Sequence, residues 1–230
     1  MIGISVAVAA AFGLLGAAAE RLAAVWPPDE ASRRRPGLRT VLLGVAAGAA
    51  GWGIVTRSTL PWLATAVHLV VLALLVLLTA TDLEQRRLPH LLLDPLIVVA
   101  VAFVPFNPSV TILDAIIGGV ASLTFLGLLG MGIRGGVALG DLYLVGALGL
   151  LLGWQGIFVA VFIGALLASV ASLALLVSRR VGMKSYIPFG PFLVAGAVIS
   201  LLRDDHLLGS ALDLGARVLA ASGVLPPLHR

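Results

Sequence analysis

The stretch Thr81-Asp-Leu-Glu-Gln-Arg-Arg-Leu-Pro-His90 decides how the rest of the chain is interpreted. It follows an apolar run, residues 61–80, that is long enough to cross a bilayer. A carboxylate, Asp82, stands where this run ends, and two arginines and a helix-breaking proline come after it. The stretch therefore predicts the end of a transmembrane helix with an acid at the edge of the membrane.

A second carboxylate, Asp141, occurs in the sequence Ala138-Leu-Gly-Asp141. Two apolar runs, residues 91–104 and 111–133, lie between the first stretch and this one. Two membrane crossings return the chain to the side from which it started. We therefore expect Asp82 and Asp141 to lie on the same side of the membrane.

The composition is that of a membrane protein. Of the 230 residues, 60% are hydrophobic and 11% are charged, which is more apolar surface than a soluble domain of this size can bury. The apolar runs are continuous rather than alternating, so we predict an all-α, polytopic protein of about eight transmembrane helices in one bundle. The chain has no cysteine, which excludes disulfides and thiolate sites, and we expect no metal and no cofactor.

The apolar runs divide the chain into spans and regions. The expected spans are residues 2–24, 40–56, 61–80, 91–104, 111–133, 141–152, 157–177 and 187–202, with an outer turn at residues 153–156. We expect residues 1–60 to form two N-terminal helices, residues 61–203 a six-helix core, and residues 204–230 an interfacial or flexible tail.

The basic residues predict the orientation. The side that carries Asp82 and Asp141 holds eleven of them: Arg21, Arg33, Arg34, Arg35, Arg39, Arg86, Arg87, Arg134, Arg179, Arg180 and Lys184. The other side holds four: Arg57, Arg203, Arg217 and Arg230. This bias places the first side in the cytoplasm and both termini outside. Basic residues confined to short connections indicate contact with membrane lipid and argue against nucleic-acid binding.

Four acids lie in or beside the expected spans: Asp82, Asp94, Asp114 and Asp141. Ionisable groups at membrane depth are costly and usually functional. The topology selects Asp82 and Asp141 as a pair, with Asp94 a weaker candidate. Simpler interpretations remain open, because Asp141 suits a helix N-cap and Asp82 suits an i,i+4 surface pair with Arg86. A proton relay through Asp94 and Asp114, as in a small transporter, is a third possibility.

Two neighbouring carboxyl groups are suited to the hydrolysis of a peptide bond. They cannot both ionise cheaply, so one keeps its proton and the pair holds a water molecule between an acid and a base. The base deprotonates the attacking water, and the acid protonates the developing oxyanion. Such a site needs no metal, thiol or activated serine.

Three segments together resemble the type IV prepilin peptidases, the A24-type GxGD aspartic peptidases. Residues 82–89 resemble the family's first aspartate motif, in which Asp is followed by a basic stretch and Ile/Leu-Pro. Gly140-Asp141 and the helix that follows resemble the second motif, and Pro188-Phe189-Gly190-Pro191 resembles a late segment of the family. The match covers roughly residues 61–202.

The resemblance implies an aspartic endopeptidase whose catalytic pair is Asp82 and Asp141. Substrate binding or the shape of the site would involve Arg86, Pro89, Gly140, and the segment Pro188, Phe189, Gly190 and Pro191. The implied partners are pilin-like precursors, whose leader peptides are cut at the cytoplasmic face of the inner membrane. Long members carry a cysteine-containing methyltransferase domain in the first loop. Here that loop is only residues 26–39, without cysteine, so we expect cleavage without N-methylation.

The chain departs from the family pattern at three positions. The second motif usually reads Gly-x-Gly-Asp-x-Lys, and here Ala138 replaces its first glycine and Tyr143 its lysine. His90 stands where the first motif usually has Asn or Asp. Alanine replaces glycine at little cost unless the backbone needs a positive φ. An inactive homologue that serves as a pilus or secretion scaffold is the alternative these departures leave open.

Overall fold

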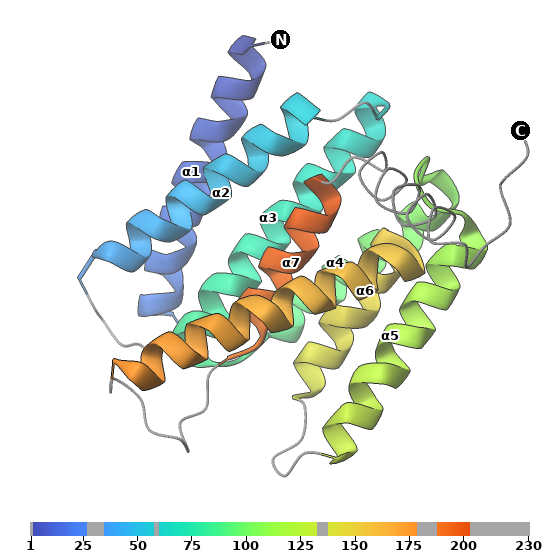
Figure 1. The fold of residues 1–230 in the computed structure, drawn as a ribbon. Coiled ribbons are helices and arrows are strands. Elements are labelled where there is room, and N and C mark those ends of the chain that lie inside the picture. The colour runs from blue at the N-terminus through green and yellow to red at the C-terminus, as the bar shows by residue number, and fades with distance from the viewer. Residues whose placement is uncertain (1, 27–34, 58–59, 133–137, 179–187, 203–230) are drawn as a thin grey trace, which may run out of the picture.

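The computed structural model describes residues 2–26, 35–57, 60–132, 138–178 and 188–202. These residues form helices and no strand. In chain order the helices are α1 (Ile2–Val25), α2 (Leu38–Arg57), α3 (Trp62–Gln85), α4 (His90–Phe103), the short 3-10 helix η1 (Val104–Phe106), α5 (Ile112–Gly132), α6 (Leu139–Val177) and α7 (Gly190–Leu202). Figure 1 shows them as one helical bundle, with α1 and α2 at one edge and α5 at the other.

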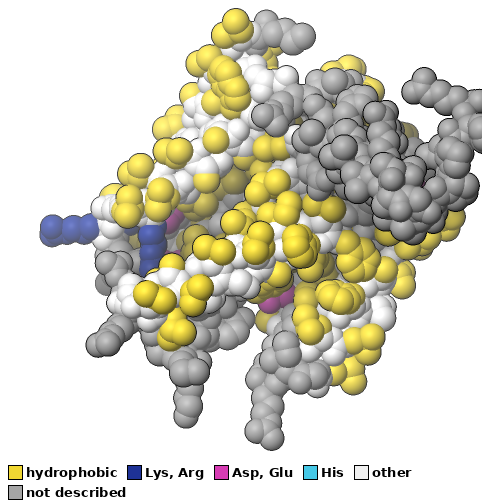
Figure 2. All heavy atoms as spheres, in the orientation of Figure 1, with side chains coloured by type: hydrophobic (Ala, Val, Ile, Leu, Met, Phe, Trp, Pro, Cys, Tyr) yellow, Lys and Arg dark blue, Asp and Glu magenta, His cyan; other side chains and the backbone are white. Residues whose placement is uncertain are grey.

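Five of the described helices, α1, α2, α3, α5 and α6, are long and apolar enough to cross a membrane. The segment His90–Phe106 and α7 are apolar but shorter. On the face shown in Figure 2, hydrophobic side chains cover much of the described surface, and the visible basic side chains lie toward one end of the bundle. The prediction of an all-α membrane protein is confirmed, whereas the count of eight spans stays a prediction.

Two helices differ from their expected bounds. Helix α3 continues beyond Ala80 to Gln85, so Asp82 lies inside its last turn rather than after its end. Arg86 then closes α3 in the left-handed conformation, with φ 55°, and its N–H donates to the carbonyl oxygen of Asp82. The helix is longer than expected because its polar last turn still has good helix formers, such as Leu83, Glu84 and Gln85.

The expected turn at residues 153–156 shrinks to one residue. Only Gly153 leaves the helical conformation within α6, with φ 68° and ψ 178°, which a glycine adopts without a steric penalty. Because of this break, the two halves of α6 run in different directions (Figure 1). The Asn107 side chain donates to the carbonyl oxygen of Leu151 over 3.0 Å, which satisfies one acceptor beside the break.

One apolar cluster joins α3, α4, α6 and α7. Its fully buried members include Leu75 and Leu78 of α3, Leu96 of α4, Leu148 of α6 and Leu193 of α7. A second cluster packs α1 and α2 against the other face of α3, through side chains such as those of Ala23, Ala47 and Val76. Helix α3 is therefore the central element that both clusters share.

Two polar contacts fix α1 to its neighbours. Glu20 lies inside α1, is 7% exposed and accepts a hydrogen bond of 2.7 Å from Thr40 of α2. Gln85, in the last turn of α3, donates to the carbonyl oxygens of Ala23 and Trp26 over 3.0 and 2.7 Å. Glu20 also lies within an expected span, and it was not among the four candidate acids selected from the sequence. Thr40 gives it a polar partner where water is excluded.

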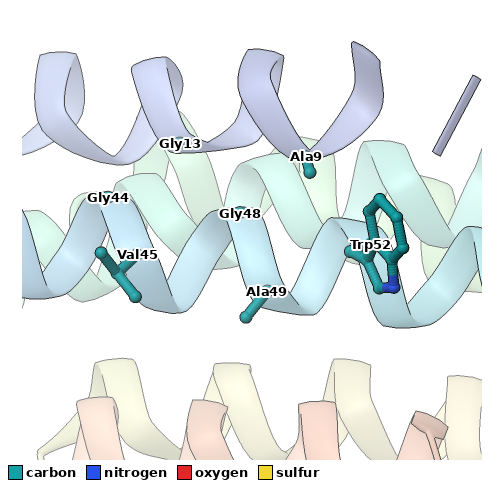
Figure 3. A pocket seen from close by; sticks show the side chains of 7 residues that line it. All are labelled: Ala9, Gly13, Gly44, Val45, Gly48, Ala49 and Trp52. Atoms are coloured by element: carbon teal, nitrogen blue, oxygen red, sulfur yellow. The ribbon is translucent and has the colours of Figure 1, made fainter. Parts of the chain in front are cut away.

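An open groove of about 470 Å³ lies between α1 and α2 (Figure 3). It is lined by Ala9, Gly13, Gly44, Val45, Gly48, Ala49 and Trp52. None of these side chains can titrate or act as a nucleophile. The groove is therefore a feature of the apolar surface and does not resemble a reaction site.

The orientation can be tested with reporter fusions. In Figure 1, α3 ends and α4 and α6 begin toward the same end of the bundle, as the expected topology requires. We expect fusions after Arg39, His90, Arg134 and Lys184 to report the cytoplasm, and a fusion after Asn107 to report the outside. A fusion after His90 that reports the outside would contradict the topology. The connections at Arg134 and Lys184 and the expected tail, residues 204–230, lie outside the described residues.

Candidate active site

Asp82 is the last member of the stripe with which α3 faces the core. Val71, Leu75 and Leu78 precede it at spacings of four and three residues, and all three are fully buried in the first apolar cluster. Residues at these spacings share one face of a helix. The same periodicity points Asp82 inward, and it is 6% exposed.

Asp141 begins the corresponding stripe of α6. Leu144, Val145 and Leu148 follow it at helical spacing and belong to the same cluster. Asp141 lies in the first turn of α6 and is 5% exposed. The alternative that it caps this helix is wrong, because the N-cap residue is Ala138 and no side chain makes a capping hydrogen bond there.

Gly190 begins a third stripe, with Leu193, Val194 and Ala197 of α7. A Cβ atom built on Gly190 would lie 2.5 Å from Oδ2 of Asp82 and 3.7 Å from Oδ1 of Asp141. These two oxygens are therefore no more than about 6 Å apart, a gap that one bridging water can span. The three stripes converge, so the structure brings the two predicted acids together beside Gly190.

Oδ2 of Asp82 has no hydrogen-bond partner among the described residues, although it is buried. The backbone N–H of Gly190 is the polar group of α7 that faces the Asp82 carboxyl. It is the first N–H of α7, and Pro191 after it has none. A buried carboxyl oxygen without a partner marks a position that water or a bound molecule would occupy.

A close contact joins the two aspartate-bearing segments. A Cβ atom on Gly140 would lie 2.9 Å from Cβ of Leu88, so any side chain at residue 140 would push the segments apart. Leu88 itself packs against the first apolar cluster. Glycine next to Asp141 therefore lets the start of α6 approach the segment that follows Asp82.

The remaining predicted residues lie at the starts of α4 and α7. Pro89 is the N-cap residue of α4, and its carbonyl oxygen accepts from the N–H groups of Leu92 and Leu93. Pro188 and Phe189 lead into α7, and Phe189 packs on the apolar cluster. Pro191 is the second residue of α7. These residues shape the backbone around the site.

Arg86 does not join the carboxylates. Its side chain is exposed whereas Asp82 is buried, and the contact that links them is the backbone hydrogen bond that ends α3. The alternative of a surface ion pair between them is therefore wrong. Arg86 shapes the site through its left-handed backbone, which turns the chain toward Leu88 and Pro89.

The other two intramembrane acids lie elsewhere. The Asp94 side chain is 68% exposed, and its Oδ1 lies 3.5 Å from Nδ1 of His90. Asp114 lies in the first turn of α5 and accepts a hydrogen bond of 2.6 Å from Thr111. Asp114 lies beside Gly153, where α6 breaks. Asp141 lies at the start of α6, so the first half of this helix separates the two acids. Local partners explain both residues.

The structure shows the setting of all three departures from the family pattern. Ala138 has φ −64° and ψ 140°, which alanine adopts without strain, so the missing glycine costs nothing here. Tyr143 and His90 contact each other, with ring centroids 5.4 Å apart and planes at 69°. Only a tertiary structure shows that they form a pair.

The side chains in the described residues offer no cluster of three or more His, Asp or Glu that could hold a metal ion. The site consists of two carboxyl groups, one backbone N–H and apolar walls. Such a set can bind a water molecule or a polar group of a peptide between an acid and a base.

Comparison with known proteins identifies a family that matches part of the chain. The profile of the Type IV leader peptidase family matches residues 69–173, a range that includes both aspartates. No solved structure matches the chain.

Three relatives carry the description "Prepilin leader peptidase/N-methyltransferase". The protein of Aeromonas hydrophila is 32% identical over 178 residues, which cover 74% of this chain and 58% of the relative. That of Neisseria gonorrhoeae is 30% identical over 174 residues, 73% of this chain and 56% of the relative. That of Bacillus subtilis (strain 168) is 24% identical over 146 residues, 60% of this chain and 56% of the relative.

The chain spans less than two thirds of the length of these relatives. The matched region nevertheless contains both aspartate segments and most of α3 and α6, which carry the two acids, whereas α7 lies beyond it. Through residues 69–173, the chain is similar to the Type IV leader peptidase family.

Proposed function

We propose that this protein is an aspartic endopeptidase of the inner membrane that cleaves the leader peptides of pilin-like precursors at the cytoplasmic face. The observation that carries the proposal is that the two buried carboxyl groups both lie close to one point next to Gly190. Oδ2 of Asp82 also lacks a hydrogen-bond partner among the described residues. The match of residues 69–173 to the Type IV leader peptidase family supports the class of substrate.

Two carboxyl groups this close, shielded from water, share a proton rather than both carry a charge. The ionised carboxylate takes a proton from the bound water, and the water oxygen bonds to the carbonyl carbon of the scissile peptide. The protonated carboxyl gives its proton to the carbonyl oxygen, which yields a gem-diol. The C–N bond then breaks as the nitrogen takes a proton from one carboxyl and a hydroxyl of the gem-diol gives a proton to the other carboxylate. A carboxylic acid and an amine leave, and the pair again holds one proton.

The position of the pair suits a substrate with an apolar helix and a polar leader. Asp82 and Asp141 lie at the ends of helices whose remaining length is apolar, so the site is at the edge of the bundle's membrane-facing part. A precursor helix that enters sideways among the spans would present its leader junction at that edge. The surface of the described helices, rich in exposed Leu, Val and Ile, is compatible with such an approach.

The active enzyme is favoured over an inactive scaffold because Ala138 is unstrained and both carboxyls are in place. The transporter alternative has less support, because Asp94 and Asp114 have local partners at separate helix starts.

Replacement of either acid tests the proposal. The chain would be co-expressed with a pilin-like precursor from the same genome, and the mass of the precursor would be followed. Asp82→Asn and Asp141→Asn should each abolish processing, because a carboxamide can neither take nor give the required proton. Asp114→Asn, at an acid beside the break at Gly153 and away from the pair, serves as the matched control and should leave processing intact. Full cleavage by either of the first two variants would exclude the proposed catalytic pair.

Gly190→Ala should stop cleavage without unfolding the protein. The added methyl would lie 2.5 Å from Oδ2 of Asp82, so it would displace the carboxylate or fill the space for water. Displacement of a reacting group by ~1 Å costs about a hundredfold in rate. Gly127→Ala in α5 is the control, because its Cβ would meet only Leu142 at 4.0 Å. Equal cleavage rates for the two variants, at similar melting temperatures in detergent, would show that residue 190 does not border the reacting atoms.

We also propose that cleavage occurs without N-methylation. The segment between α1 and α2 is short and the sequence has no cysteine, which is the composition expected of a chain without the methyltransferase domain. With S-adenosylmethionine present, the mass of the mature product should equal that of the unmodified chain. A product heavier by one methyl group, formed by the purified protein, would contradict this.

A further inference from the structure

The rings of His90 and Tyr143 meet edge to face at the point where the two aspartate segments join. Their centroids are 5.4 Å apart and their planes are inclined by 69°, the geometry that aromatic pairs prefer. His90 is the first residue of α4 and follows Pro89 directly. Tyr143 is two residues beyond Asp141 in α6. The contact therefore connects the segment that leaves Asp82 with the helix that carries Asp141.

The pair sits beside the close contact of Gly140 with Leu88. That contact leaves no room for a side chain but supplies little attraction of its own, because glycine has no side chain to bury. The rings supply an attractive contact two or three residues away on each segment. The imidazole is in turn held by Asp94, whose Oδ1 lies 3.5 Å from Nδ1 of His90.

We propose that His90 and Tyr143 form a positioning pair that fixes the distance between the Asp82 and Asp141 segments. This inference rests on the proposed peptidase function for its kinetic consequence, but the contact itself does not depend on that function.

Neither ring borders the carboxyl groups. Asp141 faces the core and is 5% exposed, whereas Tyr143 is 44% exposed and the His90 side chain 67%. The pair therefore acts on the geometry of the acids and not on the substrate. Loss of one ring should lower kcat and leave KM nearly unchanged, because only the alignment of the reacting groups is disturbed.

A double-mutant cycle tests the pair. His90→Ala and Tyr143→Ala should each lower kcat about twofold to tenfold, the range expected for one aromatic contact, and the double variant should lose no more than either single one. Tyr143→Phe keeps the ring and should retain the wild-type rate. The family-like exchange gives a sharper outcome: Tyr143→Lys and His90→Asp should each impair turnover alone, and the two together should restore it through an ion pair.

Phe125 and Phe158 supply a matched control, because they form a similar edge-to-face pair between α5 and α6, with centroids 5.8 Å apart. Phe125→Ala should lower the melting temperature in detergent and leave kcat unchanged. If Tyr143→Ala behaves in the same way, the His90–Tyr143 contact is structural only and the positioning role is refuted.

Melting temperatures measured on the same variants separate this inference from the proposed function. If the wild-type protein cleaves no pilin-like precursor, the proposed function fails. The double-mutant cycle of melting temperatures then tests on its own whether His90 and Tyr143 interact. Non-additive melting shifts for His90→Ala and Tyr143→Ala would then support the pair. Additive shifts, or additive losses of kcat, would overturn it.

Discussion

The burial of two carboxyl groups side by side, at the end of an apolar core, is the constraint on which the rest of the structure depends. Removing an isolated carboxylate from water costs several kcal/mol. The cost is lower here because three helices bring the acids together, so that two neighbouring carboxyls can share one proton beside the N–H of Gly190. Asp82 ends the core stripe of α3, Asp141 begins that of α6, and Gly190 begins that of α7. A shift in any one of these helices would separate the groups.

This arrangement explains why the polar and irregular features of the bundle lie where they do. The left-handed Arg86 ends α3 just after Asp82, and Pro89 starts α4. Gln85 ties the same turn to the end of α1. Within α6, Gly153 and Asn107 let the helix break without leaving the Leu151 carbonyl unsatisfied. The unusual backbone geometry and the tertiary hydrogen bonds thus lie where helices end or break, and apolar packing holds the rest of each helix in place.

Much of the site could be predicted from the sequence because its periodicity is local. Continuous apolar runs indicate helices, and the spacing of Leu75, Leu78 and Asp82 places the acid on the buried face. The one-residue break in α6 could not be predicted, because it depends on a tertiary partner, Asn107. The end of α3 was placed too early, because its polar last turn contains good helix formers and Gln85 also has tertiary partners in α1. The pairing of His90 with Tyr143 and the burial of Glu20 against Thr40 join residues distant in sequence, and local patterns carry no information about them.

The most direct test of the central claim is whether residues 82 and 141 lie within reach of each other in the membrane. Because the chain has no cysteine, Asp82→Cys with Asp141→Cys would introduce two unique thiols. The account predicts that a short bifunctional thiol reagent links them within one chain, as detected by mass spectrometry. The pair Asp82→Cys with Asp114→Cys, at opposite ends of the bundle, should not be linked. If thiols at residues 82 and 141 each react with a monofunctional reagent yet are never linked, the account is contradicted.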